Sequence, residues 1–309
     1  MTTFRVFAVA TLALTQACAP PPSGDHSPAS PDLGALAAEV ERLAAPAEGH
    51  VGIGVALVGN DEAVIVGGDR RYPMQSVFKL PIGMAVLAAV DRGELALDQR
   101  VAVTPADFVS DRQHSPIRDR HPDGVELTVS ELLRAAASGS DGTAADVLLD
   151  LLGGPAGVEA FLREIGVEGV DVRATEKDMG RDYDAQYRNG AAPAGAIEML
   201  RALDAGRGLS PESHALLLRL LTKTTTGRNR LRGRLPEGTP VAHKTGTSRA
   251  RDGLTAATND VGLITLPDGR RLAIAVFVSD SPADDATRER VIADVARAAY
   301  DAWSGVTTQ

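Results

Sequence analysis

The order of the patterned segments limits the fold of this 309-residue chain more than any other feature. Apolar residues at helical spacing over 33–43 are followed by a β-hairpin pattern over 51–66, with Gly59-Asn60-Asp61 between its strands. Strand patterns return only in the last third of the chain, where a helical pattern then closes the sequence: strands at 240–242, 260–266 and 272–278, and a helix at 286–303. One sheet must therefore be assembled from both ends of the chain.

The middle of the chain is helical. A helical pattern begins at Ser76 and runs to Val90, and residues 127–165 are dense in alanine and leucine. Residues 170–193 are polar and lack periodicity, and a loop of that length in a compact domain is usually functional or disordered. These patterns predict an α+β fold in which an antiparallel sheet is flanked by the N- and C-terminal helices.

We expect the helical middle to form an inserted second domain. The boundaries that follow are 32–72 and 224–309 for the α/β domain and 73–223 for the all-helical domain. A cleft between two such domains is a usual place for an active site.

The N-terminus reads as an export signal over 1–18, because a charged residue precedes an apolar run too short to span a bilayer. Two interpretations of the end of this signal are possible. Ala17-Cys18-Ala19 fits a cleavage site, and Cys18, the only cysteine, is placed where a bacterial lipoprotein carries its lipid. Residues 19–31 are rich in proline and serine and predict a linker. We therefore expect a periplasmic or secreted protein, with lipid anchoring at Cys18 as one alternative.

Composition excludes several classes of function. The net charge of −9 and the absence of a basic cluster argue against a nucleic-acid partner. The six histidines show no spacing typical of a metal site, so no metal or other cofactor is expected. Lysine occurs only four times among 32 basic residues, which directs attention to the surroundings of each one, at positions 79, 177, 223 and 244.

The first of these lysines forms the motif Ser76-Val77-Phe78-Lys79. On a helix, positions i and i+3 share a face, so the hydroxyl and the ammonium are neighbours. A serine hydroxyl is a weak nucleophile until a base removes its proton. The pair predicts a serine that can be acylated.

Two further motifs follow along the chain. Lys244-Thr245-Gly246-Thr247 comes after a short apolar strand, where the lysine and the threonine hydroxyl can hold a substrate carboxylate and the glycine leaves room for substrate against the strand. Ser140-Asp141-Gly142 follows an apolar helical segment at 129–137. Each motif alone is also compatible with a turn or a solvated strand end.

Together, the order S-x-x-K, S-D-x and K-T-G resembles the penicillin-recognising serine enzymes, and class A β-lactamases in particular. The resemblance covers nearly the whole mature chain. It implies a β-lactam substrate, catalytic roles for Ser76, Lys79 and Ser140, and substrate binding by Lys244, Thr245, Gly246 and Thr247.

The same resemblance assigns further residues. Class A enzymes carry E-x-x-L-N in a long loop, and the matching Glu176-Lys177-Asp178-Met179-Gly180 lies seventeen residues before Pro193. Glu176 is therefore the candidate for activating the water that hydrolyses the acyl-enzyme. Arg230 matches an arginine used against the substrate carboxylate, and His114 falls where an aromatic side chain lines the cleft mouth.

Two positions depart from the family pattern. Gly142 replaces the asparagine of S-D-N, and Gly180 replaces the asparagine that helps to hold the hydrolytic water. Asp146 lies one helical turn beyond Gly142. Our hypothesis is that Asp146 supports the site by lying close to Glu176 and sharing a proton with it, because two neighbouring carboxylates rarely ionise together.

The function that follows is hydrolysis of the β-lactam ring of penicillins or cephalosporins through an acyl-enzyme on Ser76, conferring antibiotic resistance, by a chain expected to be a monomer. Two alternatives share the three motifs. A D-alanyl-D-alanine carboxypeptidase, or penicillin-binding protein, would not need Glu176. A non-hydrolysing β-lactam sensor would acylate and stall.

Overall fold

The sheet at the centre of the molecule joins the two ends of the chain. A computed structural model describes residues 31–305, and its main sheet has five strands, all antiparallel, in the order β2-β1-β11-β10-β7. The strands span His50–Leu57 (β1), Val64–Val66 (β2), Val241–Thr247 (β7), Thr258–Thr265 (β10) and Arg271–Ser279 (β11). The predicted assembly of one sheet from both ends of the chain is confirmed.

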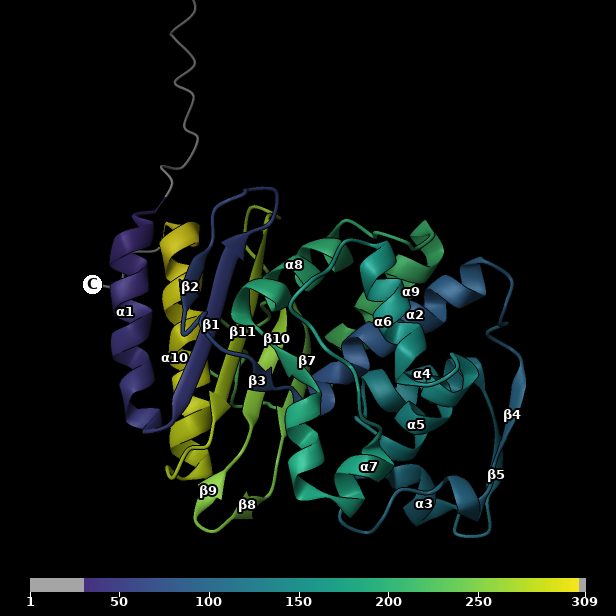
Figure 1. The fold of residues 1–309 in the computed structure, drawn as a ribbon. Helices are drawn as coiled ribbons and strands as arrows, with labels where there is room; N and C mark the ends of the chain where they lie inside the picture. Colours follow the sequence, from purple (N-terminus) through teal and green to yellow (C-terminus); the bar gives the residue numbers. More distant parts are fainter. Residues whose placement is uncertain (1–30, 306–309) are drawn as a thin grey trace, which may run out of the picture.

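The two terminal helices cover one face of this sheet (Figure 1). They are α1 (Leu33–Ala44) and α10 (Asp285–Ser304), and they pack against each other as well as against the strands. Side chains on β11 alternate between the two faces, as strand geometry requires. Leu272, Ile274, Val276 and Val278 join the core under α1 and α10, whereas Ala273, Ala275 and Phe277 face the helical side of the molecule.

The helices of the middle of the chain lie on the other side of the sheet (Figure 1). Helix α8 (Pro193–Asp204) packs directly on β1 and β11, and α2 (Lys79–Asp91) runs through the helical region as a helix buried on all sides. The remaining helices are α3 (Pro116–Arg120), α4 (Val129–Ala137), α5 (Gly142–Leu151), α6 (Pro155–Glu164), α7 (Glu176–Arg181) and α9 (Pro211–Thr222). One continuous apolar core joins these helices to the sheet.

Short elements complete the chain. The 3-10 turns are η1 (Ala45–Ala47), η2 (Gln75–Phe78), η3 (Pro105–Asp107) and η4 (Tyr183–Arg188). Three small two-stranded sheets pair β3 (Tyr72–Pro73) with β6 (Gly190–Ala191), β4 (Arg100–Val103) with β5 (Val125–Thr128), and β8 (Ala250–Arg251) with β9 (Leu254–Thr255).

The α+β fold class is confirmed, with two local corrections. Residues 170–193 are not a featureless loop, because they contain α7, η4 and β6. The strand expected at 240–242 continues to Thr247, so the K-T-G motif lies within β7 rather than after it. The domain boundaries at 72/73 and 223/224 remain a prediction.

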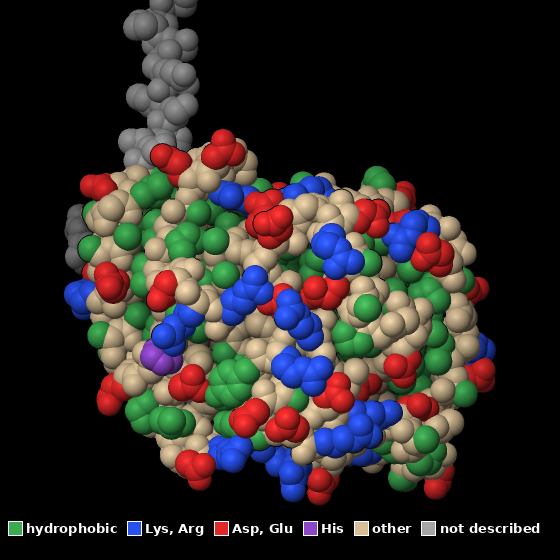
Figure 2. All heavy atoms as spheres, viewed as in Figure 1, with side chains coloured by type: hydrophobic (Ala, Val, Ile, Leu, Met, Phe, Trp, Pro, Cys, Tyr) green, Lys and Arg blue, Asp and Glu red, His purple; other side chains and the backbone are tan. Residues whose placement is uncertain are grey.

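The surface bears both signs of charge. On the face shown in Figure 2, lysine and arginine side chains alternate with aspartate and glutamate rather than gathering into one basic area. Within residues 31–305, the structure contains no helix long and apolar enough to cross a bilayer. The expected export signal, the linker up to residue 30 and Cys18 lie outside the described residues.

Candidate active site

Ser76 lies in the 3-10 turn η2, between the sheet and the first residue of α2. The preceding residue, Gln75, has a left-handed backbone with φ of 46°, a strained conformation that is uncommon for a residue with a side chain. The Gln75 amide donates a hydrogen bond to Oε1 of Gln186 at 2.6 Å. This bond ties the residue before Ser76 to the turn η4, on the other side of the pocket.

Lys79 connects three parts of the site through its Nζ atom. The ammonium donates to Ser76 Oγ at 2.9 Å and to the Ser140 carbonyl oxygen at 2.9 Å. It also forms an ion pair with Glu176 Oε1 at 2.6 Å, and both side chains are almost fully buried, at 1% and 6% exposure. The structure therefore brings Glu176 into contact with the Ser76–Lys79 pair, although Glu176 follows Ser76 by 100 residues in the sequence.

A second lysine reaches the same site from β7. Lys244 Nζ donates to Ser140 Oγ at 2.9 Å and is fully buried. Burial, and next the positive charge of Lys79, hold the pKa of Lys244 well below its usual range. Ser140 has φ of 58°, so this residue too has a left-handed backbone. The Ser140 hydroxyl accepts from Lys244, and the Ser140 carbonyl accepts from Lys79.

Asp141 anchors the Ser140 turn. Its carboxylate caps α5 by accepting from the Ala144 N–H at 2.9 Å, and it also accepts from Ser115 Oγ and the Ile117 N–H. Cap bonds of this kind are typical of aspartate at a helix N-terminus. Asp141 is therefore a buried structural residue that ties the turn to the segment after His114.

The edge strand β7 packs against the turn that carries Ser76. A Cβ atom at Gly246 would lie 2.1 Å from the Met74 carbonyl oxygen, so only glycine allows the two backbones to come this close. The space at Gly246 is filled by the protein itself, whereas the sequence interpretation left it for substrate. Thr245 Oγ1 lies 2.5 Å from Thr226 Oγ1.

Arg230 is buried behind this strand. Its guanidinium donates to Thr247 Oγ1 at 2.8 Å, to the Gly246 carbonyl at 3.1 Å and to the Asn259 carbonyl at 2.9 Å, and it forms an ion pair with Glu289 at 3.1 Å. Among residues 31–305, these contacts leave a single N–H of the guanidinium without a partner. The structure thus places Arg230 beside Thr247 with little capacity for two-point binding of a carboxylate.

Glu176 is the first residue of α7, and its position follows from the local sequence. Thr175 and Asp178 form a capping box at the start of this helix. Asp146 of α5 then accepts the main-chain N–H groups of Glu176 at 2.7 Å and Lys177 at 2.9 Å. Burial raises the pKa of Asp146 to about 7, and the charge of Glu176 adds to the increase.

The predicted proximity of Asp146 and Glu176 is therefore present, but the link runs through the main chain. Both carboxylate oxygens of Asp146 accept backbone N–H groups, and within residues 31–305 no hydrogen bond joins the two carboxyl groups. Gly142 lies next to the Glu176 carboxyl group, because a Cβ atom there would be 3.5 Å from Glu176 Cδ.

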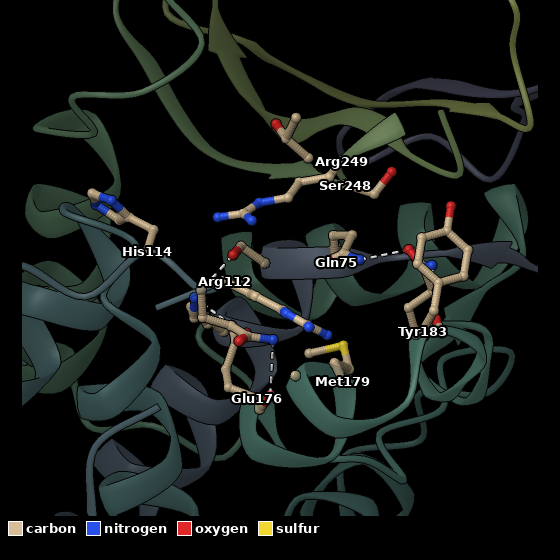
Figure 3. A pocket seen from close by; sticks show the side chains of 14 residues that line it. Gln75, Arg112, His114, Glu176, Met179, Tyr183, Ser248 and Arg249 are labelled. Atoms are coloured by element: carbon tan, nitrogen blue, oxygen red, sulfur yellow. Dashed lines mark hydrogen bonds and ion pairs between the residues drawn. The ribbon is translucent and has the colours of Figure 1, made fainter. Parts of the chain in front are cut away.

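The pocket in front of Ser76 is lined by residues of both sides of the molecule. Figure 3 shows Glu176 and Met179 on one side of the pocket and Ser248 and Arg249 on the other. His114 lines it as expected, and its Nε2 lies 3.1 Å from the Gly139 carbonyl. Met179 and Gly180 line the pocket from the motif that begins at Glu176. Sequence reasoning missed several other lining residues, which belong to no motif: Gln75, Arg112, Gln113, Tyr183, Gln186, Ser248 and Arg249.

Among residues 31–305 there is no group of three or more histidine, cysteine, aspartate or glutamate side chains that could hold a metal ion. A nucleophile, two buried lysines and a carboxylate that share one hydrogen-bonded cluster can activate a serine and then a water. This fold and site define a penicillin-recognising serine enzyme.

Comparisons with known proteins agree with that class. The model of the beta-lactamase enzyme family matches residues 35–303. The chain is 43% identical over 250 residues to the extended-spectrum beta-lactamase PER-1 of Pseudomonas aeruginosa, covering 80% of this chain and 81% of PER-1. It is 36% identical over 268 residues to beta-lactamase VEB-1 of the same organism, covering 86% of this chain and 89% of VEB-1.

A solved structure shows the same fold. A beta-lactamase from Chitinophaga pinensis superimposes with a TM-score of 0.84 at 42% identity, covering 87% of this chain and 99% of that one. The chain belongs to the beta-lactamase enzyme family and is a class A serine β-lactamase, which hydrolyses the β-lactam ring and confers resistance.

Proposed function

We propose that Ser76 is the residue that the β-lactam acylates and that Glu176 drives hydrolysis of the resulting ester. The single observation that carries this proposal is the buried cluster in which Lys79 Nζ contacts both Ser76 Oγ, at 2.9 Å, and Glu176 Oε1, at 2.6 Å. One ammonium thus connects the nucleophile to the base.

In the acylation step, Ser76 Oγ forms a bond to the lactam carbonyl carbon and loses its proton. Either Lys79, after passing a proton to Glu176, or Glu176 through a water takes that proton. The backbone N–H groups of Ser76 and Thr247 bind the oxyanion, and each such donor is typically worth about 3 kcal/mol. The ring C–N bond then breaks.

The leaving nitrogen needs a proton at this point. Ser140 is proposed to supply it, and the bonds from Lys244 to Ser140 Oγ and from Lys79 to the Ser140 carbonyl support this role. The proton that Ser140 gives up is replaced by the one that left Ser76, which Lys79 returns from Glu176 to Ser140. Glu176 is therefore a carboxylate again before water attacks.

In the deacylation step, Glu176 takes a proton from water while the water oxygen attacks the ester carbonyl. The ester bond breaks, and Ser76 Oγ recovers its proton. Asp146 supports this step by binding the main chain of Glu176 through α7.

Substrate binding is assigned to β7 and its neighbours. Lys244 and Thr245 are proposed to hold the β-lactam carboxylate, with His114 at the cleft mouth. Arg230 acts mainly by orienting the Thr247 hydroxyl, since most of its donors are already bound. Penicillins and cephalosporins are the proposed substrates, and the name of PER-1 as an extended-spectrum enzyme supports a broad range.

The decisive experiment compares Ser76→Ala and Glu176→Ala by mass spectrometry under benzylpenicillin. Ser76→Ala should show no adduct, whereas Glu176→Ala should accumulate a stable one. An absent adduct in Glu176→Ala would contradict the assignment of the deacylation base. Multiple turnovers of nitrocefin by the native chain distinguish this function from a sensor that acylates once.

Export of a monomeric chain is part of the same proposal. The apolar segment before Cys18 supports transfer out of the cytoplasm, and Cys18 remains a candidate for lipidation. Globomycin-sensitive processing, followed by labelling with a palmitate analogue, would detect a lipid anchor.

A further inference from the structure

Gly180, near the end of α7, leaves a space that another loop fills. A Cβ atom at Gly180 would lie 2.6 Å from Oε1 and 2.9 Å from Nε2 of Gln113. These distances are too short for any side chain at position 180 to coexist with the Gln113 amide as it stands. The glycine and the glutamine are therefore complementary in space.

The orientation of the Gln113 amide is fixed by its partners. Its Nε2 donates to the main-chain carbonyl of Glu176 at 3.2 Å, and its Oε1 accepts from Ser110 Oγ at 2.5 Å. A carbonyl oxygen has no hydrogen to donate, so the amide nitrogen must face Glu176. The amide consequently bridges the 110–113 turn to the first residue of α7.

The main chain around Gln113 is also held. Its N–H donates to the Ser110 carbonyl at 3.0 Å, and its own carbonyl accepts from Arg118 Nη1 at 3.2 Å. The side chain is half-buried and lines the same pocket as Ser76, Lys79 and Glu176. A side chain restrained at both ends keeps one geometry at low entropic cost, as a supporting residue requires.

We propose that Gln113 is a positioning residue for deacylation, and that its amide replaces the side-chain amide that Gly180 lacks. It acts by holding the Glu176 carbonyl, which keeps the carboxylate aimed at the pocket. The inference rests on the proposed role of Glu176.

The test compares four variants in single-turnover and steady-state assays with a penicillin: Gln113→Ala, Gly180→Asn, the double variant Gln113→Ala/Gly180→Asn, and Gln99→Ala. Gln113→Ala should slow deacylation about 10-fold or more, a part of the roughly 10²–10⁴-fold that a positioned general base supplies. Because the acyl-enzyme then accumulates, kcat and KM should fall together while kcat/KM stays nearly constant.

The glycine variants test the complementarity. Gly180→Asn alone should also slow deacylation, because the new side chain displaces the Gln113 amide. In the double variant the asparagine can enter the vacated space, and deacylation should recover at least several-fold relative to Gln113→Ala. Gln99, a half-buried glutamine on the far side of the helical region, serves as the matched control and should leave both rates unchanged.

The lifetime of the acyl-enzyme is measured per acylated chain, so a smaller folded fraction does not affect it. The inference is overturned if Gln113→Ala leaves that lifetime unchanged, or if the double variant deacylates no faster than Gln113→Ala. A failure of the underlying function looks different, since Glu176→Ala would then form no stable adduct at all.

Discussion

Lys79 Nζ lies 2.6 Å from Glu176 Oε1, and neither side chain is more than 6% exposed. A buried ion pair is costly to break, because removal of one partner leaves the other charge without compensation. This pair therefore links the stability of the site to its chemistry.

Replacing Lys79 with methionine should destabilise the fold by about 3 kcal/mol, the loss expected when one partner of a buried pair is removed. The double variant Lys79→Met/Glu176→Gln should lose clearly less, because no uncompensated charge remains. Chemical denaturation of the native chain, both single variants and the double variant gives the coupling energy. Strictly additive losses would show that the two side chains do not interact energetically.

Asp146→Asn should change the pH dependence of both stability and turnover. The pKa of Asp146 is raised to about 7, so the folded state binds a proton more tightly than the unfolded chain does. Its contribution to stability is therefore present at acidic pH and is lost as the pH rises through about 7. In thermal unfolding, the Asp146→Asn variant should not show this decrease in stability between about pH 4 and pH 7.

Turnover by the same variant should respond in the opposite sense. A protonated Asp146 can no longer accept two backbone N–H groups, so the native kcat should decline as the pH falls below about 7. Asparagine accepts through one oxygen only, and kcat should be lower but flatter with pH in this range. An unchanged pH profile would contradict a supporting role for Asp146.

Arg230→Ala should lower kcat/KM about 10-fold, mainly through KM, because the Thr247 hydroxyl loses its donor. Arg230→Lys should restore little, since an ammonium cannot reproduce the planar contacts to Thr247, Gly246 and Asn259. Steady-state kinetics with a penicillin and a cephalosporin provide the measurement. Full recovery by lysine would mean that only the charge matters.

Gly246→Ala should reduce kcat/KM about 100-fold, because the added methyl group pushes Met74 and with it the Ser76 turn. Its stability cost should be about 2–3 kcal/mol, as in other overpacked sites. Gly34→Ala, at an exposed position of α1, is the matched control and should leave activity unchanged. Native-like acylation rates in Gly246→Ala would refute the close-packing argument.

The motifs that meet at the candidate site could be recognised in the sequence because each is a short local pattern of neighbouring residues. The chain order of strands and helices likewise predicted how the sheet is assembled. The strand of Lys244, by contrast, was predicted too short. Its polar residues interrupt the apolar pattern, and their burial by η2 and α9 depends on tertiary contacts.

The structure around Glu176 could be predicted from the sequence only in part. A capping box, Thr175 to Asp178, marks the start of α7 and could have located this helix within the supposed loop. No sequence pattern of this kind indicates the contact of Gln113 with Glu176. It joins residues 63 positions apart and depends on how the 110–113 turn packs on α7.

The position of β7 at the end of the strand order has a consequence for solubility. An outermost strand presents unpaired backbone groups that can recruit a strand from another molecule, and proteins usually cover such an edge. Here the turn that carries Ser76, the proposed nucleophile, packs along β7 and so covers part of this edge. Substitutions that loosen this turn would then promote aggregation as well as reduce activity. Fewer substitutions in this turn are therefore compatible with a functional enzyme.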